Sequence, residues 1–173
     1  VETIREDVLS QLTASFVPPG SIDDQWDLDG LRRTLQDDFG IAVDPAQWLR
    51  DNEDLSAEAV AEKVCAAAND HAKAREESIG AENMRQAERA IMLSVLDSQW
   101  KDHLARMDYL RQGIHLRGYA QKQPKQEFKR EAFALFEEML DKIKAETVTI
   151  LSRVRIRTEE DMAAAERRTQ TPM

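Results

Sequence analysis

The sequence contains little of what disulfide frameworks, nucleotide sites and membrane-spanning helices require. Its 173 residues include one cysteine, five prolines and six glycines, and only 6% of them are aromatic. A single cysteine, Cys65, excludes an internal disulfide framework and a zinc site built from cysteines. The glycines lie too far apart for either glycine-rich phosphate-binding motif, so no nucleotide site is visible. No run of about 18 apolar residues is present, and no transmembrane helix is therefore predicted.

Positive charge is scarce in the first half of the chain. The formal net charge is −9, which disfavours a nucleic-acid partner because phosphate contacts need a cationic surface. Residues 1–96 carry 9 basic and 20 acidic side chains, whereas residues 97–173 carry 15 basic and 13 acidic ones. This asymmetry indicates two functional regions, with chance clustering on a solvated surface as the alternative.

Residues able to perform catalysis are present but are not arranged for it. The histidines are His71, His103 and His115, and no two share a helix face at a spacing of three or four residues, so no histidine metal pair is expected. His103 is interpreted as a packed structural residue. Cys65 and His71 lie on roughly opposite helix faces, which leaves the thiol without a base. We expect no catalytic residue, metal or cofactor in this chain, and a hydrolase using scattered carboxylates is the least favoured hypothesis.

Almost the whole chain is predicted to be helical, which makes the fold class all-α. A first helix is expected over 1–16, where one apolar stripe is formed by Ile4, Val8, Leu12 and Phe16. A capping box is expected at 21–24, and Asp29 is expected to cap a helix over 30–39 that ends at Gly40. Asp44-Pro45 indicates the start of a short helix, and Ser56 the start of a longer one.

Two long helices are predicted in the second half, over 82–116 and from Pro124 onward. The first carries a near-heptad apolar seam, which consists of Met92, Leu96, Trp100, His103, Met107, Leu110 and Ile114. The second carries another stripe, which consists of Phe128, Ala132, Leu135, Met139, Ile143, Ile150 and Val154. Long helices joined by a short turn form an antiparallel hairpin. The apolar period fades near 158, so 159–173 is predicted to be a linker or a frayed helix.

The turn between the two long helices is the distinctive feature of the sequence. Ile114, Leu116 and Tyr119 are apolar or aromatic residues among cations, at a loop tip that has no core of its own. Such groups are typical of a contact surface for another macromolecule. Tyrosine suits contact with an unfolded peptide, because it offers apolar area and a hydroxyl without demanding one sequence. The alternative is that Tyr119 folds back onto the hairpin as a plug.

This region resembles the two-helix finger of the SecA family of preprotein translocase ATPases. The match is ungapped over Asp97–Lys122 and continues over Pro124–Phe133. Weaker matches to the helical wing of the family lie at Ile4–Asp7, Pro18-Pro19, Trp26-Asp27 and Gly80–Glu82. The resemblance implies three segments: a helical wing over 1–81, a helical scaffold with the two-helix finger over 82–158, and the start of a flexible linker over 159–173.

The resemblance also implies a function. The chain would be a non-catalytic part of an ATP-driven preprotein translocation motor, with Tyr119 touching the translocating chain at the channel mouth. The rest of the tip would lie in the SecY funnel, and its residues are Ile114, His115, Leu116, Arg117, Gly118, Ala120, Gln121 and Lys122. The finger would also help to regulate the motor ATPase. Partners would be preproteins, the SecYEG channel and the motor and scaffold segments that this sequence lacks.

The family's nucleotide-binding folds and C-terminal zinc site are not in this sequence, so ATP, Mg²⁺ and zinc are expected only in a longer parent protein. The sequence does not begin with Met, and an excised fragment is expected. Localisation would be cytoplasmic, at the inner membrane through the parent. Without its scaffold partner, apolar residues such as Ile91, Leu93 and Val95 are expected to be partly exposed. Self-association through the hairpin or a rearrangement of the long helix is expected to compensate for this exposure. The alternative function is a stand-alone coiled-coil interaction module.

Overall fold

The computed structural model describes residues 1–52, 55–115 and 123–154. Throughout these ranges the regular structure is helical, without a strand, which confirms the all-α prediction. The described residues form two compact units: unit 1 contains residues 1–89 together with 148–154, and unit 2 lies within residues 90–147. The functional division predicted at residue 81 stays a prediction.

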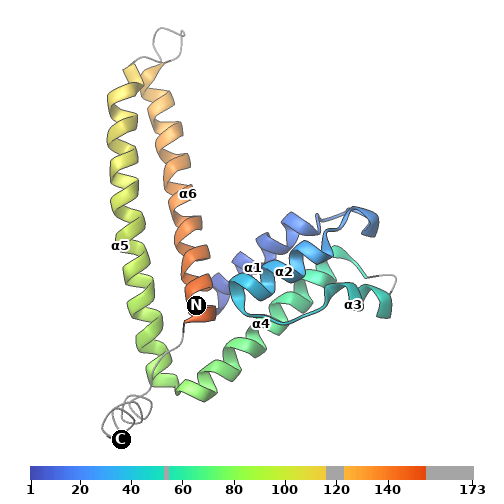
Figure 1. Ribbon diagram of the computed structural model, residues 1–173. Coiled ribbons are helices and arrows are strands. Elements are labelled where there is room, and N and C mark those ends of the chain that lie inside the picture. Colours follow the sequence, from blue (N-terminus) through green and yellow to red (C-terminus); the bar gives the residue numbers. More distant parts are fainter. Residues whose placement is uncertain (53–54, 116–122, 155–173) are drawn as a thin grey trace, which may run out of the picture. The chain divides into compact units, whose positions relative to one another are not determined.

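Unit 1 is a small helical domain with its own core (Figure 1). Its elements are α1 (Glu2–Phe16), the 3₁₀ turn η1 (Asp23–Gln25), α2 (Leu28–Phe39), α3 (Pro45–Asp51) and α4 (Ala57–Ile79). Helix α1 lies along α4, and α2 lies beside α1. The fully buried side chains of this core include Leu9, Leu31, Leu35, Val60 and Val64. They recur at helical spacing on α1, α2 and α4, which is why these three helices pack together.

Most predicted helix ends of unit 1 are confirmed. The Asp44 side chain accepts a hydrogen bond from the backbone N–H of Gln47, and the Ser56 hydroxyl accepts one from the N–H of Ala59. Gly40 ends α2 with φ +68°, a left-handed conformation that favours glycine. Polar side chains that accept hydrogen bonds from the free N–H groups of the first turn therefore fix where α3 and α4 begin.

Two predicted caps are wrong. Helix α2 begins at Leu28, two residues before the predicted start at Gly30, and its cap is Asp27, whose Oδ1 accepts from the N–H of Gly30 at 2.8 Å. The capping box at 21–24 does not form. The Ser21 hydroxyl instead donates to the Pro18 carbonyl and accepts from the Trp26 indole N–H at 2.8 Å. A half-buried indole N–H needs an acceptor, and this serine supplies it.

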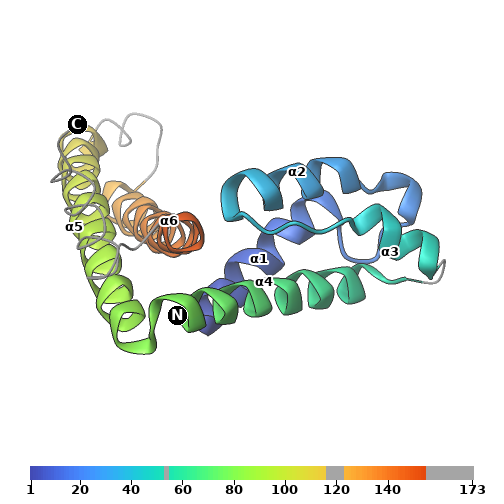
Figure 2. The ribbon, with the colours of Figure 1, turned by 60° about the horizontal axis from the view of Figure 1, so that its bottom comes forward.

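Unit 2 is the predicted antiparallel helical hairpin. It consists of residues 90–113 of α5 (Ala81–Gly113) and residues 124–147 of α6 (Pro124–Arg153), which run side by side in opposite directions (Figures 1 and 2). Helix α5 ends three residues before the predicted boundary, and Ile114 and His115 form a 3₁₀ turn. Helix α6 starts with a proline, which is tolerated at this position because the N–H groups of the first turn have no acceptor within the helix.

The predicted seam on α5 is only partly correct. Val95, His103 and Leu110 are buried, whereas Leu96 and Trp100 are more than 40% exposed. Val95 was expected to be exposed, and that prediction is wrong, while the exposure of Leu93 is confirmed. Apolar residues occupy two adjacent faces of α5, and near-heptad spacing alone does not tell which of them is covered.

Candidate functional site

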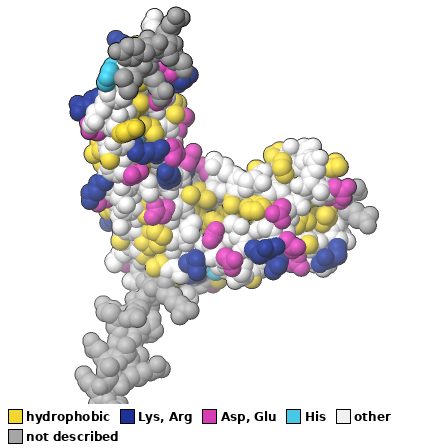
Figure 3. Space-filling model, turned by 45° about the horizontal axis from the view of Figure 1, so that its top comes forward, with side chains coloured by type: hydrophobic (Ala, Val, Ile, Leu, Met, Phe, Trp, Pro, Cys, Tyr) yellow, Lys and Arg dark blue, Asp and Glu magenta, His cyan; other side chains and the backbone are white. Residues whose placement is uncertain are grey.

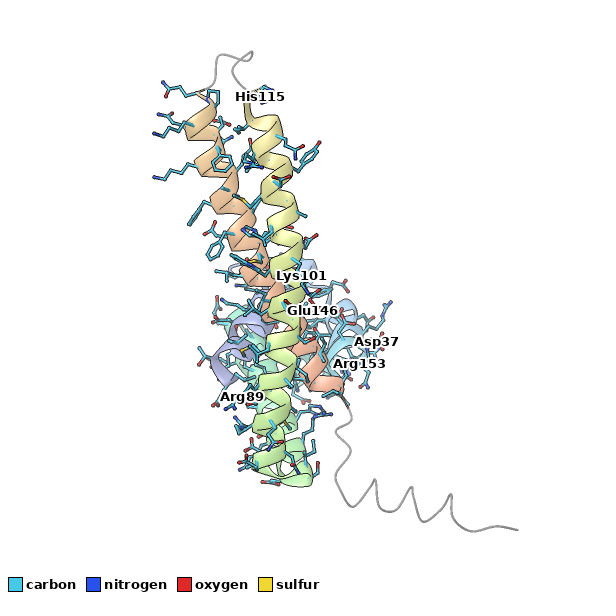
Figure 4. All side chains as sticks on the ribbon, turned by 90° about the vertical axis from the view of Figure 1, so that its left-hand side faces the viewer. Asp37, Arg89, Lys101, His115, Glu146 and Arg153 are labelled. Carbon is cyan, nitrogen blue, oxygen red and sulfur yellow. The ribbon has the colours of Figure 1, made fainter. Side chains whose placement is uncertain are left out.

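The predicted contact residues lie at the loop end of the hairpin. Ile114 is half-buried and His115 is exposed at the end of α5 (Figure 4). The remaining predicted residues lie outside the described ranges, and they are Leu116, Arg117, Gly118, Tyr119, Ala120, Gln121 and Lys122. Whether Tyr119 contacts a partner or plugs the hairpin therefore stays a prediction. The contacts of the two helices on either side of the loop are described in its place.

Polar contacts join α5 to α6 along unit 2. The Gln99 amide donates to Glu146 at 2.8 Å, and the Arg106 guanidinium donates to Glu138 at 2.6 Å. Lys142 lies one turn beyond Glu138 on α6 and contacts its second carboxylate oxygen at 2.9 Å. Figure 4 shows Lys101 and Glu146 on the two neighbouring helices. Exposed ion pairs contribute little stability one by one, but side chains so far apart in sequence fix how α5 and α6 align.

The Glu138 carboxylate is the most perturbed acid of the hairpin. Its hydrogen bonds from Arg106 and then Lys142 lower its pKa from 4.5 to about 2. The same contact with Glu138 raises the pKa of Arg106. Both effects have one cause, because each charged partner favours the ionised form of the other.

We expect the stabilising effect of Glu138 to be lost in acid. The folded pKa lies below the unfolded one, so the contribution is present above about pH 4.5 and disappears as pH falls toward 2. In Arg106→Gln the pKa of Glu138 rises toward 4.5, as a carboxyl-carbon NMR titration will show. Arg130→Gln is the matched control, because Arg130 pairs with Glu127 at 2.6 Å instead. A Glu138 that titrates near 4.5 in the unmodified chain contradicts this prediction.

Seven large apolar side chains of unit 2 are exposed, and we call this set the hairpin face. Its members are Leu93, Leu96, Trp100 and Leu104 on α5 and Phe133, Phe136 and Leu140 on α6. Each is at least 40% exposed. In Figure 3, apolar side chains shown in yellow interrupt the charged ones along the hairpin. Because large exposed apolar patches are typical of sites that contact another macromolecule, this set is a candidate contact surface.

His103 connects the two halves of the hairpin face. Its ring lies 5.6 Å from that of Trp100 on the same helix and 6.1 Å, edge to face, from that of Phe136 on α6. The side chain is buried, and its Nδ1 has no hydrogen-bond partner within the described ranges. The interpretation of His103 as a packed residue is confirmed. Sequence reasoning missed Phe136, although its spacing from Phe133 and Leu140 marks one helix face.

Within the described ranges no three side chains of the metal-binding kind come together. Cys65 is half-buried, with its sulfur 3.6 Å from the Ser10 hydroxyl and 3.9 Å from the Glu6 carbonyl oxygen. Across the same part of the chain, each helix is too short or too polar to cross a membrane.

Comparison with known proteins matches both units. The family model for the SecA Wing and Scaffold domain covers residues 1–155. A protein named "Protein translocase subunit SecA" from Stenotrophomonas maltophilia is 56% identical over 166 residues. Proteins of the same name from Xylella fastidiosa and Nitrosococcus oceani are 56% and 53% identical over that length. Each match covers 96% of this chain and 18% of the relative, so the chain spans less than a fifth of the curated relatives it matches.

The family model covers the described parts of both units, and the relatives agree with it in name. The chain therefore belongs to the SecA wing and scaffold family.

Proposed function

We propose that the chain is the non-catalytic helical part of an ATP-driven translocase that moves preproteins through the SecYEG channel. The family and the names of its relatives support a role in protein translocation. The observation that carries the proposal is the hairpin itself. Helices of 33 and 30 residues run about 50 and 45 Å, and polar contacts hold them side by side. Between them lies the segment 116–122, whose sequence is aromatic and cationic.

The tip loop is the proposed contact with the moving polypeptide and with SecY. Tyr119 offers an aromatic ring and a hydroxyl, so it can touch many sequences without selecting one. The flanking cations Arg117 and Lys122 favour encounter with acidic or anionic partners more than final affinity. In the longer parent, the same hairpin would help to restrain ATP turnover, and the complex would lie in the cytoplasm at the inner membrane.

The hairpin face is the proposed contact with the rest of the parent protein. Because the chain spans 18% of its relatives, most of such a protein lies outside this sequence. Its motor would bind ATP and Mg²⁺, its C-terminus would bind zinc, and its remaining scaffold segment would cover the apolar stripe of α5 and α6. An amphipathic helix laid on an apolar groove is a common way to bury such a surface.

The test is a substitution series in the intact translocase. We expect Tyr119→Gly to lower the amount of preprotein transported by about tenfold, the effect of removing one strong contact residue. Tyr119→Phe keeps the aromatic area and retains most transport. Transport is measured as protease-protected preprotein in vesicles.

Tyr109 provides the matched control. It lies on α5 of the same hairpin and is 81% exposed, so Tyr109→Ala removes a tyrosine side chain without touching the tip. Equal losses in Tyr109→Ala and Tyr119→Gly would contradict a special role for the tip. A loss of helix content in Tyr119→Gly would instead support the plug.

The hairpin face also favours the second candidate function, a stand-alone helical interaction module. The two functions differ in what the tip touches. Crosslinking from position 119 in the parent to SecY or to a stalled secretory chain supports translocation. Crosslinks to other helical proteins alone support the module.

A further inference from the structure

Unit 1 contains a cavity that plays no part in the functions proposed so far. Its volume is about 340 Å³, within the usual range for small-molecule sites. Residues of α1, α4 and the first turns of α5 line it, together with the C-terminal turns of α6. Its apolar wall is formed by Ile41, Ala68, Met84 and Val148, all buried. Charged side chains also line the cavity, so it offers both apolar and polar contacts.

Arg75 is one of the cations that line the cavity. Its guanidinium donates to the backbone oxygen of Val154 near the end of α6. The Nε atom is buried with no hydrogen-bond partner in the part of the chain that the structure describes. Burial lowers the pKa of Arg75, which reflects the cost of holding its charge away from water. The residue as a whole is half-buried, and an anion at the cavity wall would supply the charged partner that Arg75 lacks in the described part of the chain.

The other cations of the cavity differ in how well they are neutralised. Arg85 contacts Glu76 at 2.7 Å and Glu88 at 2.9 Å. Arg5 donates to the neutral amide oxygen of Asn69 at 3.1 Å. Neither Arg5, Arg75 nor Lys73 has an ion pair within the described ranges. The cavity therefore offers three cations that an incoming anion could use.

The carboxylates of the cavity limit how much negative charge it can accept. Glu2 and Asp70 also line it, and neither has an ion pair in the described part of the chain. With Arg85 and its two partners Glu76 and Glu88 included, four cationic side chains face four carboxylates, so the side chains of the lining are neutral before a ligand enters. A singly charged carboxylate adds less uncompensated charge to such a lining than a phosphate dianion does.

We infer that this cavity binds a small organic monocarboxylate with a short aliphatic chain. The carboxylate accepts hydrogen bonds from the Arg75 guanidinium, and the aliphatic chain packs on Met84 and Val148. Planar guanidinium groups match carboxylates in geometry, and the apolar wall supplies the remaining contact area. This inference stands apart from the proposed role in translocation, because none of these residues belongs to the hairpin tip or to the hairpin face.

The experiment is an NMR titration of the full 173-residue chain with hexanoate at constant ionic strength. We expect saturable shifts of the backbone amides around the cavity and of the Arg75 Nε–H. For a ligand with so few atoms, the dissociation constant should be about 1–10 mM. Hexanamide has the same shape without the charge and should bind at least about tenfold more weakly.

Two arginine variants complete the test. Arg75→Gln keeps a side-chain donor for the Val154 oxygen and should weaken hexanoate binding by about tenfold or more. Arg33→Gln removes an equal charge from the exposed side of α2, outside the cavity lining, and should change nothing. If Arg75→Gln does not fold, Lys73→Gln at the exposed rim should still weaken binding measurably.

Three results would overturn the inference. Hexanamide could bind as well as hexanoate, Arg33→Gln could weaken binding as much as the cavity variants, or no saturable shift could occur. In the last case Arg75 serves only to satisfy the last carbonyls of α6, as arginines near helix C-termini do.

Discussion

Replacing Leu35 with alanine is expected to lower the free energy of unfolding of unit 1 by about 2–5 kcal/mol. Leu35 lies on α2 and is fully buried, at 0% exposure, in the core shared by α1, α2 and α4. The loss has two parts, the transfer free energy of the missing methyl groups and the cavity they leave. Domains of this size are stable by only about 5–15 kcal/mol, so much of unit 1 would unfold under mild denaturant.

The measurement must report on unit 1 alone, because two units need not unfold together. Trp26 and Trp48 belong to unit 1 and Trp100 to unit 2, so a Trp100→Phe background makes tryptophan fluorescence specific to unit 1. The matched control is Ile22→Ala. Ile22 is 61% exposed, and its truncation should cost less than about 0.5 kcal/mol. Equal urea midpoints for the two variants would refute the assignment of the core.

Replacing Leu104 and Phe133 together with glutamine is expected to abolish most self-association of the isolated chain. Both side chains are more than half exposed on the hairpin face, one on each helix. Burying each in a contact between two copies is worth about 1 kcal/mol at this degree of exposure. In a contact of this face with itself both copies lose the two side chains, about 4 kcal/mol in all, so the dissociation constant should rise about 1,000-fold.

Light scattering across a range of concentrations measures this effect. The unmodified chain should change from monomer to larger species as its concentration rises, and the double variant should do so only at much higher concentration. Ile22→Gln is the control, because it removes an exposed aliphatic side chain from unit 1. A strict monomer in the unmodified chain would show that the hairpin face does not self-associate.

Local signals in the sequence predict a helix end correctly where the residue at that end has no competing hydrogen-bond partner elsewhere in the fold. Asp44, Ser56 and Gly40 act where expected, because each meets a need of the backbone within three residues. Ser21 fails as a predicted cap because its hydroxyl serves the Trp26 indole instead. Competition among polar partners is a tertiary effect, and no pattern of spacing reveals it.

The long hairpin is predictable, but the side of it that is covered is not. Strong helix formers and the break at Gly113 define α5 and its end. The choice between Val95 and Leu96 as the buried residue depends on α6, which lies far along the sequence. The contact between Arg106 and Glu138 joins residues 32 positions apart, and only the folded backbone brings them together.

The candidate site divides in the same way. Residue types at the tip and the ungapped resemblance indicate a contact loop, because both are properties of a short continuous segment. The hairpin face and the Arg75 cavity are assembled from separate helices, so their members carry no common local signal. The exposure of Leu93 on α5 is predicted from the sequence, but the sequence does not indicate that Phe133 on α6 is exposed as well.

The ties between α5 and α6 have a mechanical consequence. Two parallel rods that can slide past each other bend independently, whereas rods pinned at several points bend as one thicker beam. Gln99 with Glu146 and Arg106 with Glu138 are two such ties, each weak because it is exposed to solvent, and the ring contact between His103 and Phe136 is a third. A load applied at the loop end would then travel down the pair as compression and tension in the two helices instead of being lost as flexing. Salt screens the contact between Arg106 and Glu138, so raising the ionic strength should make the hairpin easier to bend while its helix content stays unchanged.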